Sequence, residues 1–209
     1  FKTDFMFFGM EYGPDRAIWH QRGLSRVAIW RRMANLIRAE IGDAIWLGCG
    51  FPLWAATGLV DAVRICRDVG VKWSGEQSAE SLLRDQTTRN HASGILWQSD
   101  PDCIMLRDHY HDLTDQQVNA LALFAGLSGG VLMTSDSLDI LSSDRAELFT
   151  SLGNLDIVGC SHPDLGRNEP TIRQLTTLRA GSVLTFILDP KTGACSCIDE
   201  SGEPWPKVK

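Results

Sequence analysis

The chain has 209 residues, of which 44% are hydrophobic and 22% are charged, and its formal net charge at pH 7 is -6. These values describe a globular protein with one substantial domain and room for a second, smaller one. The excess of negative charge argues against nucleic acid and against a membrane surface as partners, because both attract basic patches.

In the first part of the chain, strand-like segments alternate with helix-like ones. The expected strands are 1–7, 44–50, 62–69, 95–100 and 131–136. The expected helical segments are an amphipathic stretch, 15–43; a short helix or irregular loop, 52–60; a helix capped by Ser78, 78–92; a helix capped by Thr114 that ends at Gly129 and Gly130; and a helix capped by Ser142 or Ser143, 142–153. This alternation predicts parallel strands joined by right-handed crossovers, in either an open doubly wound sheet or part of an eight-stranded barrel.

The pattern changes after about residue 154. Turn-forming residues at 162–170 precede two strand-like runs, 183–188 and 194–198, which are separated by a DPKTG turn and predict a β-hairpin. We therefore expect one unit over 1–154 and a β-rich unit over 155–209.

The six cysteines have no regular spacing and indicate free thiols in a reducing compartment, so we expect a cytoplasmic protein. The uncharged stretch 44–60 is shorter than a membrane span and contains Pro and Gly. No nucleotide-binding glycine motif follows any expected strand.

Polar residues gather where the expected strands end, which is where barrels of this kind carry their active groups. Asp4 and Asp68 come from different strands, and each has a cation near it in sequence, Lys2 and Arg64 respectively. Two carboxyl groups that face one gap are what glycoside cleavage needs. The alternatives are that Lys2 and Asp4 form a structural ion pair, and that any single Asp only caps a turn or helix.

Four blocks of the sequence together resemble a known family. They are FKTDF, LGCGFPLWAATGLVDAVRICRDVG, ILWQSDPDCIMLRD and LALFAGLSGGVLMTSD, and they cover roughly residues 1–150. In this order they resemble the second half of the catalytic barrel of family 36 glycoside hydrolases, the α-galactosidase type. The resemblance implies an α/β fold: a partial (β/α)8 TIM barrel, about strands 4 to 8, followed by the start of a C-terminal antiparallel β-domain. It also implies a fragment of a longer enzyme, in keeping with a first residue that is Phe.

The resemblance assigns roles to individual residues. Asp4 matches the family's nucleophile and Asp68 its acid/base, while Lys2 reaches sugar hydroxyls and Arg64 supports the substrate or the acid. Cys49 falls where the family lines the sugar subsite. The sequence departs from the better-known members at Thr3 and Met6, and in the longer R-x-x-x-D spacing of Arg64 and Asp68.

Weaker signals add candidates. Asp100, with Asp102, either contacts the acid/base or a sugar hydroxyl, or belongs to a Pro-containing turn with self-capping side chains. Trp46 lies near a strand end and either stacks on a sugar or packs in the core. His109 and His111 have metal-ligand spacing but no third ligand is indicated, so we predict no metal.

We therefore predict a retaining α-galactosidase that requires no cofactor and acts on an α-galactoside oligosaccharide or glycoconjugate. We expect either a homo-oligomer or association with the missing N-terminal half of the same chain. A galactosyl-transferring transglycosylase, a Schiff-base lyase that uses Lys2, and a non-catalytic barrel fragment remain alternatives.

Overall fold

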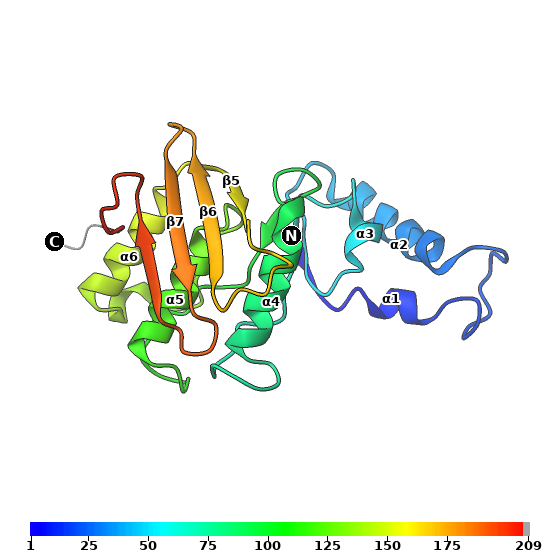
Figure 1. The fold of residues 1–209 in the computed structure, drawn as a ribbon. Helices are drawn as coiled ribbons and strands as arrows, with labels where there is room; N and C mark the ends of the chain where they lie inside the picture. The colour runs from blue at the N-terminus through cyan, green and yellow to red at the C-terminus, as the bar shows by residue number, and fades with distance from the viewer. Residues whose placement is uncertain (207–209) are drawn as a thin grey trace.

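Figure 1 shows the computed structural model, which describes residues 1–206 and contains two separate sheets. The first sheet is parallel, and its strands are, in spatial order, β1 (Lys2–Thr3), β2 (Leu47–Gly48), β3 (Ala62–Arg64) and β4 (Gln98–Asp100). The register aligns Thr3 with Gly48, Gly48 with Val63, and Arg64 with Asp100. The strands therefore end at a common edge, as the alternating pattern predicts.

The parallel strands are shorter than predicted, and two segments differ from the prediction. Residues 131–136 do not form the predicted strand. They make a single parallel bridge, between Ile104 and Thr134, and the Val131 amide donates to the Ser99 carbonyl at 2.8 Å. The predicted strand 1–7 is confirmed only at β1: residues 4–7 leave the sheet, and a short helix that the sequence did not predict, α1 (Phe8–Glu11), follows them.

Helix positions follow the predicted segments, with later starts. α2 (Arg26–Ile41) begins well after residue 15, because Ser25 supplies the N-cap and accepts from the Ala28 amide at 3.2 Å. α3 (Leu53–Ala56) is the predicted short helix. α4 (Ala79–Arg89) continues into a 3₁₀ turn, η1 (Asn90–Ala92).

The predicted N-caps are confirmed in position, but only one uses its side chain, and the helix that Thr114 begins ends at Gly126, before the predicted Gly129 and Gly130. Thr114 and Gln117 form a reciprocal capping box at the start of α5 (Asp115–Gly126). The Ser78 hydroxyl donates instead to the Gly75 carbonyl at 2.7 Å and makes no bond to an α4 amide. A 3₁₀ turn, η2 (Leu138–Ile140), precedes α6 (Ser143–Gly153), which Ser142 starts without a side-chain bond.

The second sheet is antiparallel and follows the chain order. Its strands are β5 (Ile157–Ser161), β6 (Ile172–Leu178), β7 (Val183–Leu188) and β8 (Cys195–Ile198). The predicted hairpin of β7 and β8 is confirmed, whereas β5 and β6 were not predicted because their residues flank a long turn-rich segment.

Two hydrophobic clusters hold these layers together. In Figure 1, β6 and β7 lie over α5, while α1, α2 and α3 lie at the opposite end of the molecule. The larger cluster joins the helices to the antiparallel sheet, with Phe124 and Phe186 at a ring-centroid distance of 6.4 Å. The smaller one surrounds Trp30, Trp46 and Phe51 under the parallel sheet. None of the helices within residues 1–206 is both long and apolar enough to cross a bilayer.

Truncation of Phe186 tests whether the antiparallel sheet and the helices share one core. Phe186 is fully buried, so Phe186→Ala should lower the free energy of unfolding by about 3–5 kcal/mol. Its neighbour Ile187 points to the other face and is 36% exposed, so Ile187→Ala should cost about 1 kcal/mol or less. Urea unfolding measures both, and equal losses would contradict this packing.

Candidate active site

Arg64 is the centre of a buried charge cluster at the carboxyl edge of the parallel sheet. It is the last residue of β3, and its side chain is only 6% exposed. Its Nε lies 3.3 Å from Asp100 Oδ2, Nη2 lies 2.6 Å from Asp102 Oδ1, and Nη1 lies 3.1 Å from Asp68 Oδ1. One guanidinium thus binds three carboxylates, which suits its planar fork of donors.

Asp100 and Asp102 are brought to Arg64 by the end of β4 and the turn after it. Asp100 stands directly opposite Arg64 in the sheet, with a completely buried side chain. Asp102 has a φ of 73°, a left-handed conformation that Asp tolerates better than most residues, and its amide donates to Asp100 Oδ1 at 2.8 Å. The Pro-containing turn is therefore real, and both carboxylates also serve the cluster.

The electrostatics of the cluster follow from its burial. Burial raises the pKa of Asp100, and the Arg64 charge opposes that rise. For Arg64, burial alone would lower the pKa, but the carboxylates of Asp102 and Asp100 raise it above its ordinary value. The guanidinium is consequently a permanent charge at this edge.

Asp68 differs from the other two carboxylates in its exposure. Its side chain is 97% exposed, against 0% for Asp100 and 9% for Asp102. It follows β3 in the chain, and within residues 1–206 its ion-pair partner is Arg64. The cluster thus presents one carboxylate to solvent and keeps two beneath it.

Asp4, Lys2 and Cys49 form the neighbouring part of the same edge. Lys2 and Asp4 are exposed, and the Asp4 carboxylate accepts from the Phe5 amide at 2.7 Å. Burial raises the pKa of the Cys49 thiol to about 11; Arg64 opposes the rise, a hydrogen bond and charge from Asp4 add to it, and Lys2 opposes it. Cys49 is therefore a neutral thiol between the Asp4 side and the Arg64 side of the edge.

Trp46 does not belong to this site, in contrast to the sugar-stacking interpretation of the sequence. Its ring is completely buried, its Nε1 donates to Thr3 Oγ1 at 2.8 Å, and it meets Phe51 edge-on at 5.7 Å between ring centroids. The Arg38 guanidinium covers it at 5.4 Å. No face of the indole is left for a ligand, so Trp46 is a packing residue.

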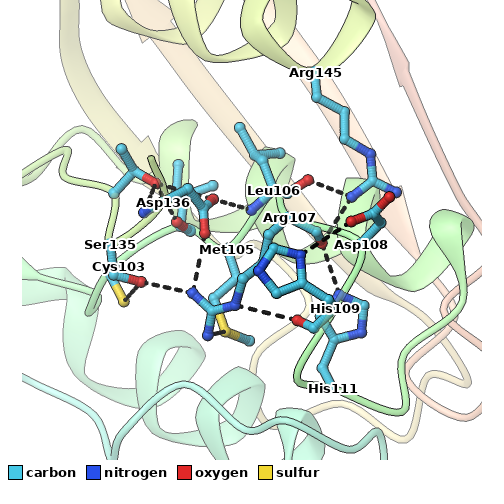
Figure 2. Close-up of polar contacts among 12 residues, drawn as sticks. Cys103, Met105, Leu106, Arg107, Asp108, His109, His111, Ser135, Asp136 and Arg145 are labelled. Atoms are coloured by element: carbon cyan, nitrogen blue, oxygen red, sulfur yellow. Dashed lines mark hydrogen bonds and ion pairs between the residues drawn. The ribbon is translucent and has the colours of Figure 1, made fainter. Parts of the chain in front are cut away.

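A second polar cluster follows the next strand-like segment and is shown in Figure 2. The fully buried Asp136 side chain accepts from Arg107 Nη1 at 3.0 Å and from the Leu106 amide. Arg145 donates to the Arg107 carbonyl at 3.0 Å. His111 Nε2 lies 2.7 Å from that same carbonyl, and its Nδ1 accepts from the Leu113 amide, so both ring nitrogens are engaged within the loop.

The structure therefore joins Arg64, Asp68 and Asp100 directly, and places Asp4, Lys2 and Cys49 beside them. Asp102, which the sequence offers only as a weaker candidate alongside Asp100, makes the shortest of the three contacts to Arg64.

The comparisons with known proteins concern the fold. No protein-family model matches the sequence. An α-galactosidase from Thermus thermophilus matches with a TM-score of 0.62 and 21% identity, over 84% of this chain and 35% of that chain. A family 27 β-L-arabinopyranosidase from Geobacillus stearothermophilus matches with a TM-score of 0.63 and 11% identity, over 77% and 41%. α-Galactosidase I from Mortierella vinacea matches with a TM-score of 0.62 and 9% identity, over 78% and 47%.

The chain thus spans less than half of the length of each of these structures. It shares its fold with glycoside hydrolases of the α-galactosidase type, and at these identities the likeness shows the fold alone. Of these three structures, the β-L-arabinopyranosidase alone is named with a family number, and that family is 27. The likeness therefore does not single out family 36.

Removal of the Arg64 charge should destabilise the fold, because two buried carboxylates would then lack their positive partner. We expect Arg64→Met to lower the free energy of unfolding by about 3–5 kcal/mol at pH 7, because Asp100 and Asp102 stay buried without their cation. Burial raises the pKa of Asp100, so protonation relieves this penalty. The loss in free energy of unfolding should be smallest below about pH 4, where Asp100 is protonated in both the folded and the unfolded chain. It should grow as the pH rises from there through the raised pKa of Asp100 in the folded protein, and level off above it.

Denaturant unfolding at several pH values measures this deficit. Arg67→Met is the matched control: Arg67 is half exposed, and its partner Asp85 keeps Arg89 within 3.7 Å. That change should cost about 1 kcal/mol or less. A similar, pH-independent loss in both variants would contradict the buried cluster.

Proposed function

We propose that this chain carries the two catalytic carboxylates of a retaining α-glycoside hydrolase, an α-galactosidase of family 36. In this proposal, residues 1–154 are the second half of the catalytic (β/α)8 barrel, about strands 4 to 8, and residues 155–209 begin the C-terminal β-domain. The observation that carries it is the exposed Asp68, held by Arg64 at the same sheet edge as the exposed Asp4. The fold shared with α-galactosidases supports it.

The proposed reaction is a double displacement. Asp4 attacks the anomeric carbon, and a carboxylate–carbon bond forms as the bond to the leaving oxygen breaks. Asp68 gives its proton to that oxygen. Asp68 then takes a proton from water, the water oxygen displaces Asp4, and both carboxyl groups return to their starting states. Two inversions give net retention, and no cofactor enters.

The surrounding residues would bind and orient the sugar. Lys2 projects from β1 beside the nucleophile and can donate to sugar hydroxyls. Cys49, kept as a neutral thiol, would line the sugar subsite without adding charge. Asp100 is completely buried, so its role would be to hold Arg64 and not to touch the substrate.

The proposed substrate is an α-galactoside oligosaccharide or glycoconjugate. Among the structures of similar fold, the Thermus thermophilus enzyme was solved with 4-nitrophenyl α-galactopyranoside and the Saccharomyces cerevisiae α-galactosidase with raffinose. Transfer of galactose to another sugar instead of water would use the same two carboxylates. A non-catalytic barrel fragment is the alternative outside enzymes.

Substitution of the two carboxylates tests the assignment in the full natural protein. Asp4→Gly should lower kcat on 4-nitrophenyl α-galactoside by roughly 10³-fold or more, because the covalent step is lost. Added azide should restore part of the rate in Asp4→Gly and form β-galactosyl azide, since it enters from the nucleophile's side.

Asp68→Ala should lower kcat/KM on raffinose by about 10²–10⁴-fold, the usual contribution of general acid catalysis. Asp61 provides a control, since it pairs with Arg38 at 2.8 Å and precedes β3, away from the carboxyl edge. Asp61→Asn should leave the rate within a few-fold. Full activity in either Asp4→Gly or Asp68→Ala would overturn the assignment.

A further inference from the structure

We infer that Asp102 is a positioning residue for Asp68, so that the exposed carboxylate is held in place by a buried one. The inference rests on the proposed function of Asp68 as acid/base and goes beyond it by naming what fixes that group. It starts from a closed ring of contacts through Arg64, Asp68, Val69 and Asp102.

The two carboxylate oxygens of Asp102 bind two different members of this ring, Arg64 and the Val69 amide. Its Oδ1 lies 2.6 Å from Arg64 Nη2, and its Oδ2 accepts from the Val69 amide at 2.6 Å. The Val69 amide belongs to the peptide group that directly follows the Asp68 Cα. Asp102 therefore fixes the backbone next to Asp68, and through Arg64 it also fixes the donor that contacts the Asp68 carboxylate at 3.1 Å.

Asp100 cannot replace Asp102 in this role. Its Oδ2 contacts Arg64 Nε at 3.3 Å, and its Oδ1 accepts from the Asp102 amide in its own turn. Among the contacts of residues 1–206, only Asp102 joins both the guanidinium and the segment after Asp68. Asp100 supports the buried base of the cluster, and Asp102 connects it to the solvent-exposed end at Asp68.

The contacts of Asp102 restrict the conformational freedom of Asp68, the proposed acid/base. A side chain that is 97% exposed has freedom to rotate, and general acid catalysis needs it within hydrogen-bond reach of the leaving oxygen. Anchoring its peptide and its ion-pair partner to one buried group restricts that freedom. Asp102 is 9% exposed, below the substrate-facing surface, so it acts through Asp68.

Two substitutions at Asp102 separate positioning from folding. Asp102→Asn tolerates the φ of 73° but has a single acceptor oxygen, so it must release either Arg64 or Val69. Asp102→Gly also accepts that φ and releases both. The matched control is Asp136→Asn, which removes another buried carboxylate that binds an Arg and a backbone amide at the neighbouring strand end.

The activity test compares two leaving groups in the full natural protein. The leaving oxygen of raffinose must be protonated as its bond breaks. The 2,4-dinitrophenolate of 2,4-dinitrophenyl α-galactoside is so weak a base that it departs without a general acid. For Asp102→Asn and Asp102→Gly, kcat/KM on raffinose should fall by about 10- to 100-fold, with a change of less than about three-fold on the dinitrophenyl substrate. Asp136→Asn should change both substrates by the same factor. Equal losses on both substrates in the Asp102 variants would overturn the inference.

Hydrogen exchange provides a second readout that needs no activity. The Val69 amide should exchange at least about 10-fold faster in Asp102→Gly and be unchanged in Asp136→Asn. Unchanged Val69 exchange in Asp102→Gly would also overturn the inference. If the natural protein cleaves neither substrate, the proposed function fails by itself, and the Val69 exchange rate still decides whether Asp102 holds this segment.

Discussion

The burial of one positive charge is the constraint on which the carboxyl edge of the parallel sheet depends. Arg64 sits at the end of β3 with a side chain that is 6% exposed, and an unpaired guanidinium there would be very costly. Asp100 and Asp102 offset that cost from the adjacent strand and its turn. With the charge already balanced from below, Asp68 can point outward and still contact Arg64 at 3.1 Å. Asp68 is therefore not needed to neutralise Arg64 and can remain exposed to solvent.

The rest of the fold serves to bring these strand ends together. Strands of two or three residues offer few hydrogen bonds, so the sheet depends on what packs beneath it. Trp46 and Trp30 fill that space, and the indole of Trp46 donates to Thr3, which ties β1 to β2 at the residue before Asp4. The same tryptophan that the sequence offers as a sugar platform therefore sets the position of the proposed nucleophile from inside the core.

The parallel direction of the strands could be predicted from the sequence, because strand–helix alternation is a local signal, whereas their sequential order was implied only by the family resemblance. Strand lengths could not, since tertiary packing decides how far a ladder extends: 131–136 has the composition of a strand but makes a single bridge, at Thr134. β6 was missed because its sequence, IRQLTTL, lacks the apolar run of β7, and because β5, one of its two partners, lies across a long turn. At the site, Asp68 and Arg64 share a five-residue motif, whereas the Asp102–Val69 bond joins positions 33 apart, which no local pattern reveals.

Comparison of the two Arg–Asp clusters shows what marks one of them as a candidate site. Both lie after neighbouring strand-like segments, and in both a buried Asp binds a guanidinium and a backbone amide, through Asp102 in one and Asp136 in the other. Around Asp136, the Arg107 guanidinium in Figure 2 binds the buried carboxylate and the His109 carbonyl, both within the loop region. Around Asp102, the guanidinium has a third carboxylate left over, and that one faces solvent. The same structural device thus stabilises a loop in one place and, in the function that we propose, presents a catalytic group in the other. The difference is that Arg64 also binds the exposed Asp68, whereas the contacts of Arg107 within residues 1–206 include no second carboxylate.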